Sequence, residues 1–278
     1  MDRRPRSFYV LSAVFALFVL FLYGPILTIG ILSFQGPQGG LTFPMNGVSL
    51  HWFRDLFQEQ AVGDIWGAFR RSLVLGLLVM VTTVIVSVMA GLAFRKRFAG
   101  SGLLFYAAIT SLVIPSILIS LGVGLIFNQL GLKIHWATSG FGSQLTWTLP
   151  FGLLIMFAVF NRFDKSYEEA ARDQGATAWQ TLRHVVLPII APSLIGVALF
   201  GFTLSYDEFA RTLLTAGSYN TLPLEIFGMT TNVTTPVIYA LGTLTTAFSF
   251  VIIAVFLVSV WVMGRRRARH GSDAGKAA

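Results

Sequence analysis

Six long apolar stretches run through this chain, and their length restricts the possible folds more than any other feature. They cover roughly residues 9–33, 72–94, 103–127, 140–160, 192–214 and 237–263. A helix needs about 20 apolar residues to cross the hydrocarbon core of a membrane. Because only 12% of the residues are charged, we predict an all-α membrane protein with six transmembrane helices, forming one domain over residues 1–278.

The composition excludes several functional classes. The chain has no cysteine, so disulfides and thiolate metal sites are excluded. Its mean hydropathy of +0.73 indicates that most of the chain lies within a lipid bilayer. The net charge of +8 does not indicate nucleic-acid binding, because the basic residues lie at the ends of apolar spans and form no continuous patch.

The distribution of Lys and Arg predicts the orientation of the spans. If both termini are cytoplasmic, 15 of the 20 basic residues fall in cytoplasmic segments, and the outer side keeps only Arg54, Arg70, Arg71, Lys133 and Arg211. This bias agrees with the positive-inside rule. The charged loop at residues 161–191, between the fourth and fifth spans, is then cytoplasmic.

That loop contains "SYEEAARDQGATAWQTLRHVVLP", residues 166–188. Ser166 and Glu169 have the spacing of a capping box, which predicts that a helix begins there. Glu168 and Arg172 are four residues apart and can pair on one helix face. Gly175 is placed to end the helix in a left-handed turn. The loop is therefore expected to form a short helix, a bend and a second helix.

One face of the first helix is almost without side chains, because it carries alanines and a glycine. The order Glu169-Ala170-Ala171, three residues, Gly175, and then Leu187-Pro188 resembles the "EAA" signature of permease subunits of binding-protein-dependent type I ABC importers. The resemblance implies the fold of these permeases, in the inner membrane of a bacterium. It also implies that Glu169, Ala170, Ala171, Gly175, Leu187 and Pro188 belong to a coupling helix that docks on an ATPase.

The same resemblance implies several partners. These are a dimer of a cytoplasmic ABC ATPase, a periplasmic substrate-binding protein, and a second permease subunit that is either a similar chain or a second copy of this one. ATP and Mg²⁺ would be bound by the ATPase. This agrees with the sequence, which has no G-x-x-x-x-G-K-[ST] motif for binding nucleotide phosphates. We expect no cofactor, no metal site and no catalytic residue on this chain.

Two carboxylates give the main indication of the substrate. Asp207 and Glu208 lie 15 or 16 residues beyond Pro192, which corresponds to roughly 22 Å into the fifth span. Charged residues at that depth pair with one another or face a cavity. Asp207 could pair with Arg211 at i+4. Alternatively, at least one carboxylate faces the transport pathway and favours a cationic solute.

The segment "LSYDEFARTLLTAGSYNTLPLEI", residues 204–226, resembles the second permease of spermidine/putrescine importers. The resemblance implies a polyamine or a related cationic or zwitterionic amino compound as the substrate. The alternative is a stand-alone secondary transporter of a small organic cation, which would need inverted repeats and ion-coupling acids in several spans. An intramembrane enzyme would need a nucleophile or a metal cluster at membrane depth.

Overall fold

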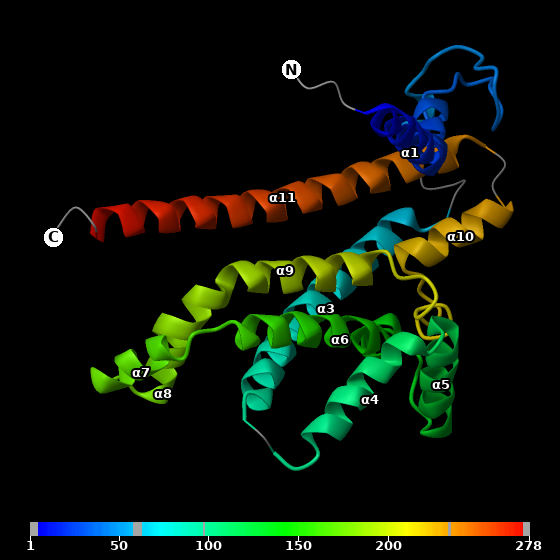
Figure 1. Cartoon of the computed structure of the whole chain (residues 1–278). Coiled ribbons are helices and arrows are strands. Elements are labelled where there is room, and N and C mark those ends of the chain that lie inside the picture. Colours follow the sequence, from blue (N-terminus) through cyan, green and yellow to red (C-terminus); the bar gives the residue numbers. More distant parts are fainter. Residues whose placement is uncertain (1–4, 58–62, 97, 233–234, 275–278) are drawn as a thin grey trace. The chain divides into compact units, whose positions relative to one another are not determined.

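The computed structural model describes residues 5–57, 63–96, 98–232 and 235–274, and its described part is helical (Figure 1). Within these residues the only β pairing is an isolated bridge between Gln35 and Val48. Arg3, Arg4, Arg97 and Lys276, which contribute to the predicted charge bias, lie outside the described residues. The helices are α1 (Arg6–Leu32), α2 (His51–Asp55), α3 (Ile65–Phe94), α4 (Ser101–Val113), α5 (Ser116–Gln129), η1 (Trp136–Gly140), α6 (Phe141–Asn161), α7 (Ser166–Asp173), α8 (Ala178–Thr181), η2 (Leu182–Val186), α9 (Leu187–Tyr206), α10 (Leu222–Asn232) and α11 (Val237–Ala274).

Five of the described helical segments are long and apolar enough to cross a membrane. They are Arg6–Leu32, Ile65–Phe94, Trp136–Asn161, Ala178–Tyr206 and Val237–Arg265. The pair α4 and α5 passes the same test as one segment and makes a sixth. The all-helical membrane fold predicted from the sequence is therefore confirmed.

The third expected span, 103–127, is not a straight helix. α4 and α5 meet at an angle of 111° across a short break at Ile114 and Pro115. Proline has no N–H to donate to the preceding turn, and it disfavours helical geometry in the residue before it. Ile114 is accordingly extended, with φ −71° and ψ 129°.

The contacts within the chain divide it into two compact units. One consists of Met1–Asp64 with Ile226–Phe250, and the other of Ile65–Glu225 with Val251–Ala278. In the first unit, the buried Gln35 side chain organises the loop after α1. Its Oε1 accepts a hydrogen bond from the Asn46 N–H at 2.8 Å, and its Nε2 donates to the Gly40 carbonyl at 3.2 Å.

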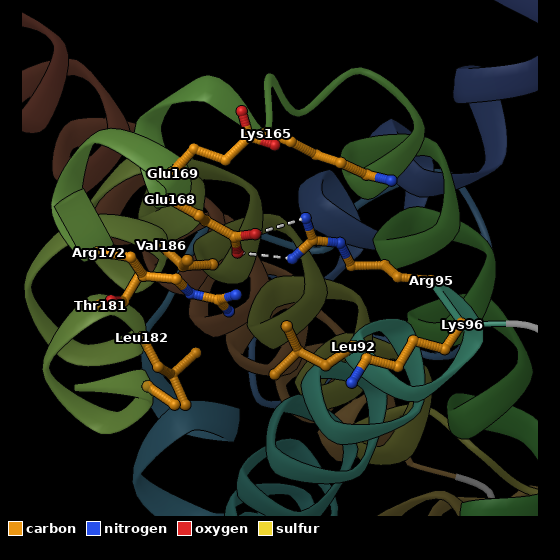
Figure 2. Close-up of a pocket in the computed structure, with 11 residues that line it drawn as sticks. Leu92, Arg95, Lys96, Lys165, Glu168, Glu169, Arg172, Thr181, Leu182 and Val186 are labelled. Carbon is orange, nitrogen blue, oxygen red and sulfur yellow. Dashed lines mark hydrogen bonds and ion pairs between the residues drawn. The ribbon is translucent and has the colours of Figure 1, made fainter. Parts of the chain in front are cut away.

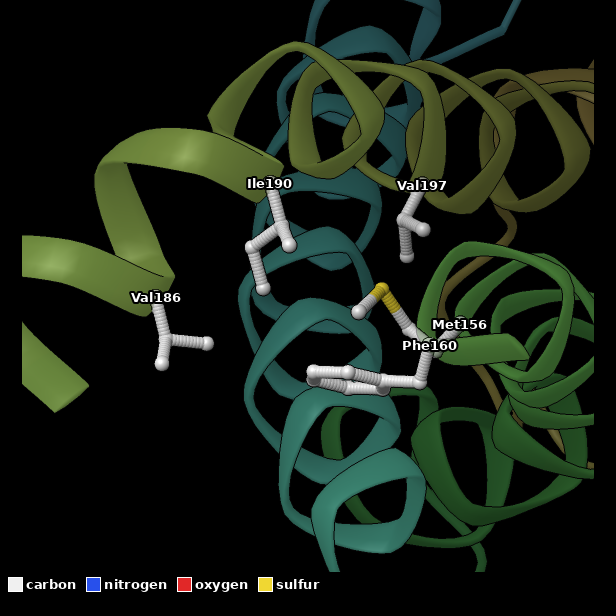
Figure 3. Packing of buried hydrophobic residues seen from close by; sticks show 5 residues of the cluster. All are labelled: Met156, Phe160, Val186, Ile190 and Val197. Carbon is white, nitrogen blue, oxygen red and sulfur yellow. The ribbon is translucent and has the colours of Figure 1, made fainter. Parts of the chain in front are cut away.

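The core of the second unit is built by α3, α6 and α9. A cluster of buried apolar side chains joins α6 to η2 and α9 (Figure 3), and it consists of Met156, Phe160, Val186, Ile190 and Val197. Since lipid tails are as apolar as these side chains, close contact rather than water exclusion must stabilise such a bundle.

Glycines allow this close contact. A Cβ added at Gly91 would lie 3.0 Å from the Met156 Cβ, and one at Gly201 would lie 3.2 Å from the Met80 Cα. A buried hydrogen bond of 2.8 Å between Thr83 and Thr148 also connects α3 to α6. Small residues and polar pairs of this kind are typical of helix contacts inside membranes.

Candidate functional site

The segment between α6 and α9 forms a helix, a bend and a second helix, as the sequence predicts. The expected capping box at the start of α7 is wrong, however, because no side chain caps the helix there. Instead, the Asp164 carboxylate accepts a hydrogen bond from the Ser166 N–H at 2.9 Å. This bond lowers the pKa of Asp164 below its usual value. A capping box does begin α8, where Thr177 and Gln180 bond reciprocally.

Gly175 ends α7 in the left-handed turn that the sequence predicts, with φ +83°. The Gly175 N–H donates to the Arg172 carbonyl at 2.8 Å, and the Ala176 N–H donates to the Ala171 carbonyl at 3.0 Å. These two bonds define a Schellman motif, which satisfies the last carbonyls of the helix. A side chain at position 175 would have to adopt a conformation that L-residues rarely adopt.

The α7 surface is open to solvent. Glu169, Ala170 and Gly175 are exposed, and no residue of α7 is buried. Two large aromatic side chains lie near these small residues in the sequence and are also exposed, Tyr167 at 55% and Trp179 at 64%. Exposed aromatic groups of this size often mark a protein contact surface.

Glu168 pairs with Arg95, which directly follows α3, and not with Arg172 as its spacing suggests. Arg95 Nη1 donates to Glu168 Oε1 at 2.7 Å, and Nη2 donates to Oε2 at 2.9 Å (Figure 2). These hydrogen bonds hold the pKa of the Glu168 carboxyl below its usual value. The pair lines a cavity of about 440 Å³ between the end of α3 and the α7–η2 segment.

Leu187 and Pro188 begin α9 directly after the π-helical turn η2. Pro188 cannot donate a hydrogen bond to the carbonyl of His184, four residues earlier, so regular α-helical bonding is interrupted at this point. π-helical turns commonly occur where α-helical bonding is disturbed in this way. Val186, in the same turn, is 1% exposed and anchors it in the core.

α9 begins earlier and ends earlier than the expected fifth span, 192–214. It has 20 residues and ends at Tyr206, so it is about 30 Å long, which matches the hydrocarbon thickness. Asp207 and Glu208 therefore follow the helix at its end and do not lie inside it. Because α9 begins at Leu187, five residues before Pro192, the two carboxylates lie further along the helix than the count from Pro192 indicates.

The two carboxylates have different surroundings. Glu208 Oε1 accepts a hydrogen bond from the Arg211 backbone N–H at 2.9 Å, so Glu208 stabilises the turn after α9. Asp207 is exposed, and its side chain forms no hydrogen bond or ion pair with any described residue. The Asp207–Arg211 ion pair suggested by their spacing does not form.

The Arg211 side chain is fully buried, and its hydrogen-bond partners are neutral groups. It donates to the Ser111 carbonyl at 3.1 Å, the Ser116 hydroxyl at 3.3 Å and the Thr146 hydroxyl, and it lies 4.9 Å from the centre of the Trp147 ring. It thereby fixes the loop after α9 to α4, α5 and α6. Because the hydrogen-bond partners lie 65 to 100 residues away, local spacing could not have indicated them.

No group of three or more His, Asp or Glu side chains that could hold a metal ion occurs among the described residues.

Similar solved structures define the class of protein to which this fold belongs. A bacterial ABC transporter involved in the import of alginate matches with a TM-score of 0.62 at 17% identity, covering 97% of this chain and 99% of that chain. The inward-facing MetNI methionine ABC transporter matches with a TM-score of 0.55 at 18% identity, covering 72% and 94%. The fold is therefore that of the membrane subunits of ABC importers.

The sequence defines the family. Residues 83–268 match the model of the binding-protein-dependent transport system inner membrane component, and the chain belongs to this family. It is similar to the spermidine/putrescine transport system permease protein PotC of Haemophilus influenzae, at 28% identity over 89% of this chain and 95% of the relative. It is also similar to the putrescine transport system permease protein PotI of Escherichia coli, at 29% identity over 81% of each.

Family membership makes this chain a transport permease subunit of the bacterial inner membrane and not an enzyme. It favours an ATP-driven importer over the alternative of a stand-alone secondary transporter.

Proposed function

We propose that this permease imports a polyamine or a related cationic or zwitterionic amino compound, together with a separate ATPase. The observation that carries the substrate class is the similarity to spermidine/putrescine permeases along 89% of the chain. We infer that the other components are a cytoplasmic ATPase dimer that binds ATP and Mg²⁺, a periplasmic substrate-binding protein and a second permease subunit. A heterodimer of permeases is favoured over two copies of this chain.

We infer that α7 is the coupling helix and docks on the ATPase. The exposed Glu169 and Ala170 support this role, because a helix surface with little side-chain bulk allows close approach of a partner backbone. The exposed Tyr167 and Trp179 would add apolar contact area beside it. Ala171 and Gly175 complete the helix and its terminal turn, while Leu187 and Pro188 connect the segment to α9.

This role requires the loop at residues 161–191 to be cytoplasmic. In the arrangement that we propose, one transmembrane domain of six spans has both termini on the same side as this loop. The closure of two ATPase subunits on ATP would then move α7 together with its counterpart in the second permease.

The pathway for the solute is inferred to include Asp207. An exposed carboxylate at the end of a membrane-spanning helix, without a partner among the described residues, can attract an ammonium group. Glu208 lies next to it but already stabilises the following turn through the Arg211 N–H. We therefore assign Glu208 a smaller part in solute selection than Asp207.

The coupling role is tested with Glu169→Lys and Gly175→Glu in the assembled importer. Both variants should insert normally but lose most putrescine uptake while ATP hydrolysis continues, because a reversed charge or a strained turn disturbs docking. Gln174→Lys is a matched control, since it adds a charge about 140° around the helix from Glu169. Wild-type uptake in both test variants would exclude the coupling role of α7.

A further inference from the structure

α7 is held in its unit by one ion pair, by a ring contact between Tyr167 and Phe163, and by its contacts with η2. No residue of α7 is buried, so apolar packing contributes little to its position. Among the described residues, the Arg95–Glu168 pair is the only side-chain hydrogen bond or ion pair that joins α7 to α3, α6 or α9. Force that a partner exerts on α7 can therefore reach α3 directly through this pair, beside the indirect route through η2, which contacts α7 and packs against α3.

The burial and the geometry of the Arg95–Glu168 pair suit it to transmit force between α7 and α3. Both side chains are only 15% exposed, so water and salt weaken their attraction less than at an open surface. The two parallel hydrogen bonds fix the relative orientation of the guanidinium and carboxylate planes. The Arg95 guanidinium also lies 5.2 Å from the centre of the Phe160 ring and 5.4 Å from that of Phe163.

Phe160 links this pair to the core. It belongs to α6 and packs in the buried cluster with Met156 and Val186. One side chain, Arg95, thus contacts the end of α6 and the α7 carboxylate while it directly follows α3. Among the described residues, no other side chain both bonds α7 through a hydrogen bond or ion pair and contacts the end of α6.

We propose that Arg95 is the positioning residue that transmits movement of α7 to α3 and α6. The proposal rests on the proposed role of α7 in docking the ATPase. Arginine suits this task because its planar fork bonds the carboxylate at two points while its face stacks on aromatic rings. A lysine at this position would keep the charge but would offer a single flexible point of attachment.

The test measures putrescine transported per ATP hydrolysed by the assembled importer in proteoliposomes. Arg95→Gln should lower this ratio by about three- to tenfold, with the ATPase still co-purifying, and Arg95→Lys should give an intermediate ratio. Lys96→Gln is the matched control, because it removes the same charge from the next residue, whose side chain bonds no described residue. An unchanged ratio in Arg95→Gln would overturn the proposal.

A double-mutant cycle separates transmission from a general loss of stability. Arg95→Gln and Glu168→Gln remove the same link, so the double variant should lose no more than the stronger single variant. Losses that multiply would contradict the proposal. Thermal unfolding of each purified complex shows whether a lower ratio merely follows from destabilisation.

A second measurement does not depend on the solute. The chain has no cysteine, so spin labels can be attached at Met89→Cys in α3 and Asp173→Cys in α7. In a complex whose partners also lack cysteine, the distance between the two labels reports the separation of α3 and α7. The separation should be the same with and without ATP, and it should change or broaden with ATP in Arg95→Gln. An identical distribution in both backgrounds would overturn transmission through Arg95.

The outcomes separate the two proposals. If Glu169→Lys and Gly175→Glu leave uptake unchanged, the docking role of α7 fails. If these variants uncouple the importer while Arg95→Gln behaves as wild type, only the transmission proposal fails.

Discussion

Neighbouring residues of the same charge have different roles at the end of α9. Glu208 accepts a hydrogen bond from the Arg211 N–H, whereas the Asp207 side chain is exposed and bonds no described group. A carboxylate that already stabilises a turn has less capacity to bind a solute, and its removal acts first on the local fold.

We predict that Asp207→Asn lowers putrescine uptake by about tenfold but changes the uptake of an uncharged analogue little, because only the cation loses an attractive charge. Glu208→Gln should lower the uptake of both compounds to a similar, smaller extent. Competition assays with putrescine and 1,4-butanediol in proteoliposomes measure this difference. Equal losses for both compounds in Asp207→Asn would show that Asp207 has no role in charge selection.

At the residue scale, the sequence was informative where the interaction is local. The turn at Gly175 follows from a glycine placed after a short helix. The pairing of Arg95 with Glu168 spans 73 residues, and the Arg211 contacts span up to 100 residues. No spacing rule applies to such distances, because only the packing of the helices brings these side chains together.

At the scale of the helices, two glycines of α6 show how a missing side chain affects the packing against α3. Gly152 is buried, and a Cβ there would overlap the Ser87 side chain and lie 3.0 Å from Thr83 Cγ2. Gly142 belongs to the same helix, is exposed, and has no atom within 4 Å of the equivalent position. The two glycines therefore share a backbone conformation but differ in what surrounds them.

We predict that Gly152→Ala destabilises the protein by about 1–3 kcal/mol because α3 and α6 are forced apart. Gly142→Ala should be neutral or slightly stabilising, since alanine favours the helix by roughly 0.5–1 kcal/mol over glycine. Thermal unfolding in detergent compares the two variants. A stabilised Gly152→Ala variant would mean that this helix contact is looser than the structure indicates.

The apolar stretches predicted the helices better than they predicted the ends of the helices. Hydropathy continues past Tyr206 through Phe209 and Leu213, so the sequence extended the fifth span to 214. In the structure the hydroxyl of Thr212 donates to the carbonyls of Glu208 and Phe209, which stabilises a turn there. Competition of this kind between side-chain and backbone hydrogen bonds is invisible to an average over apolar residues.

At the scale of the whole molecule, the orientation in the membrane stays a prediction from the charge bias. We expect α7 and both termini to lie on the cytoplasmic side. A cysteine introduced at Asp173 should then react with a membrane-impermeant maleimide only after the cells are opened. A cysteine at Tyr219, which is 57% exposed, should react in intact spheroplasts. The opposite pattern would exclude α7 as the docking helix for a cytoplasmic ATPase.

The glycine contacts among α3, α6 and α9 have a consequence for motion during transport. Where a glycine lies this close to atoms of the next helix, sliding one helix along the other would bring larger side chains into the same space and create overlaps. We therefore expect the three helices to tilt as a rigid body. The corner at Pro115, where the chain turns by 111°, is held on both sides by Arg211 through Ser111 and Ser116, so α4 and α5 should follow α6 in this movement.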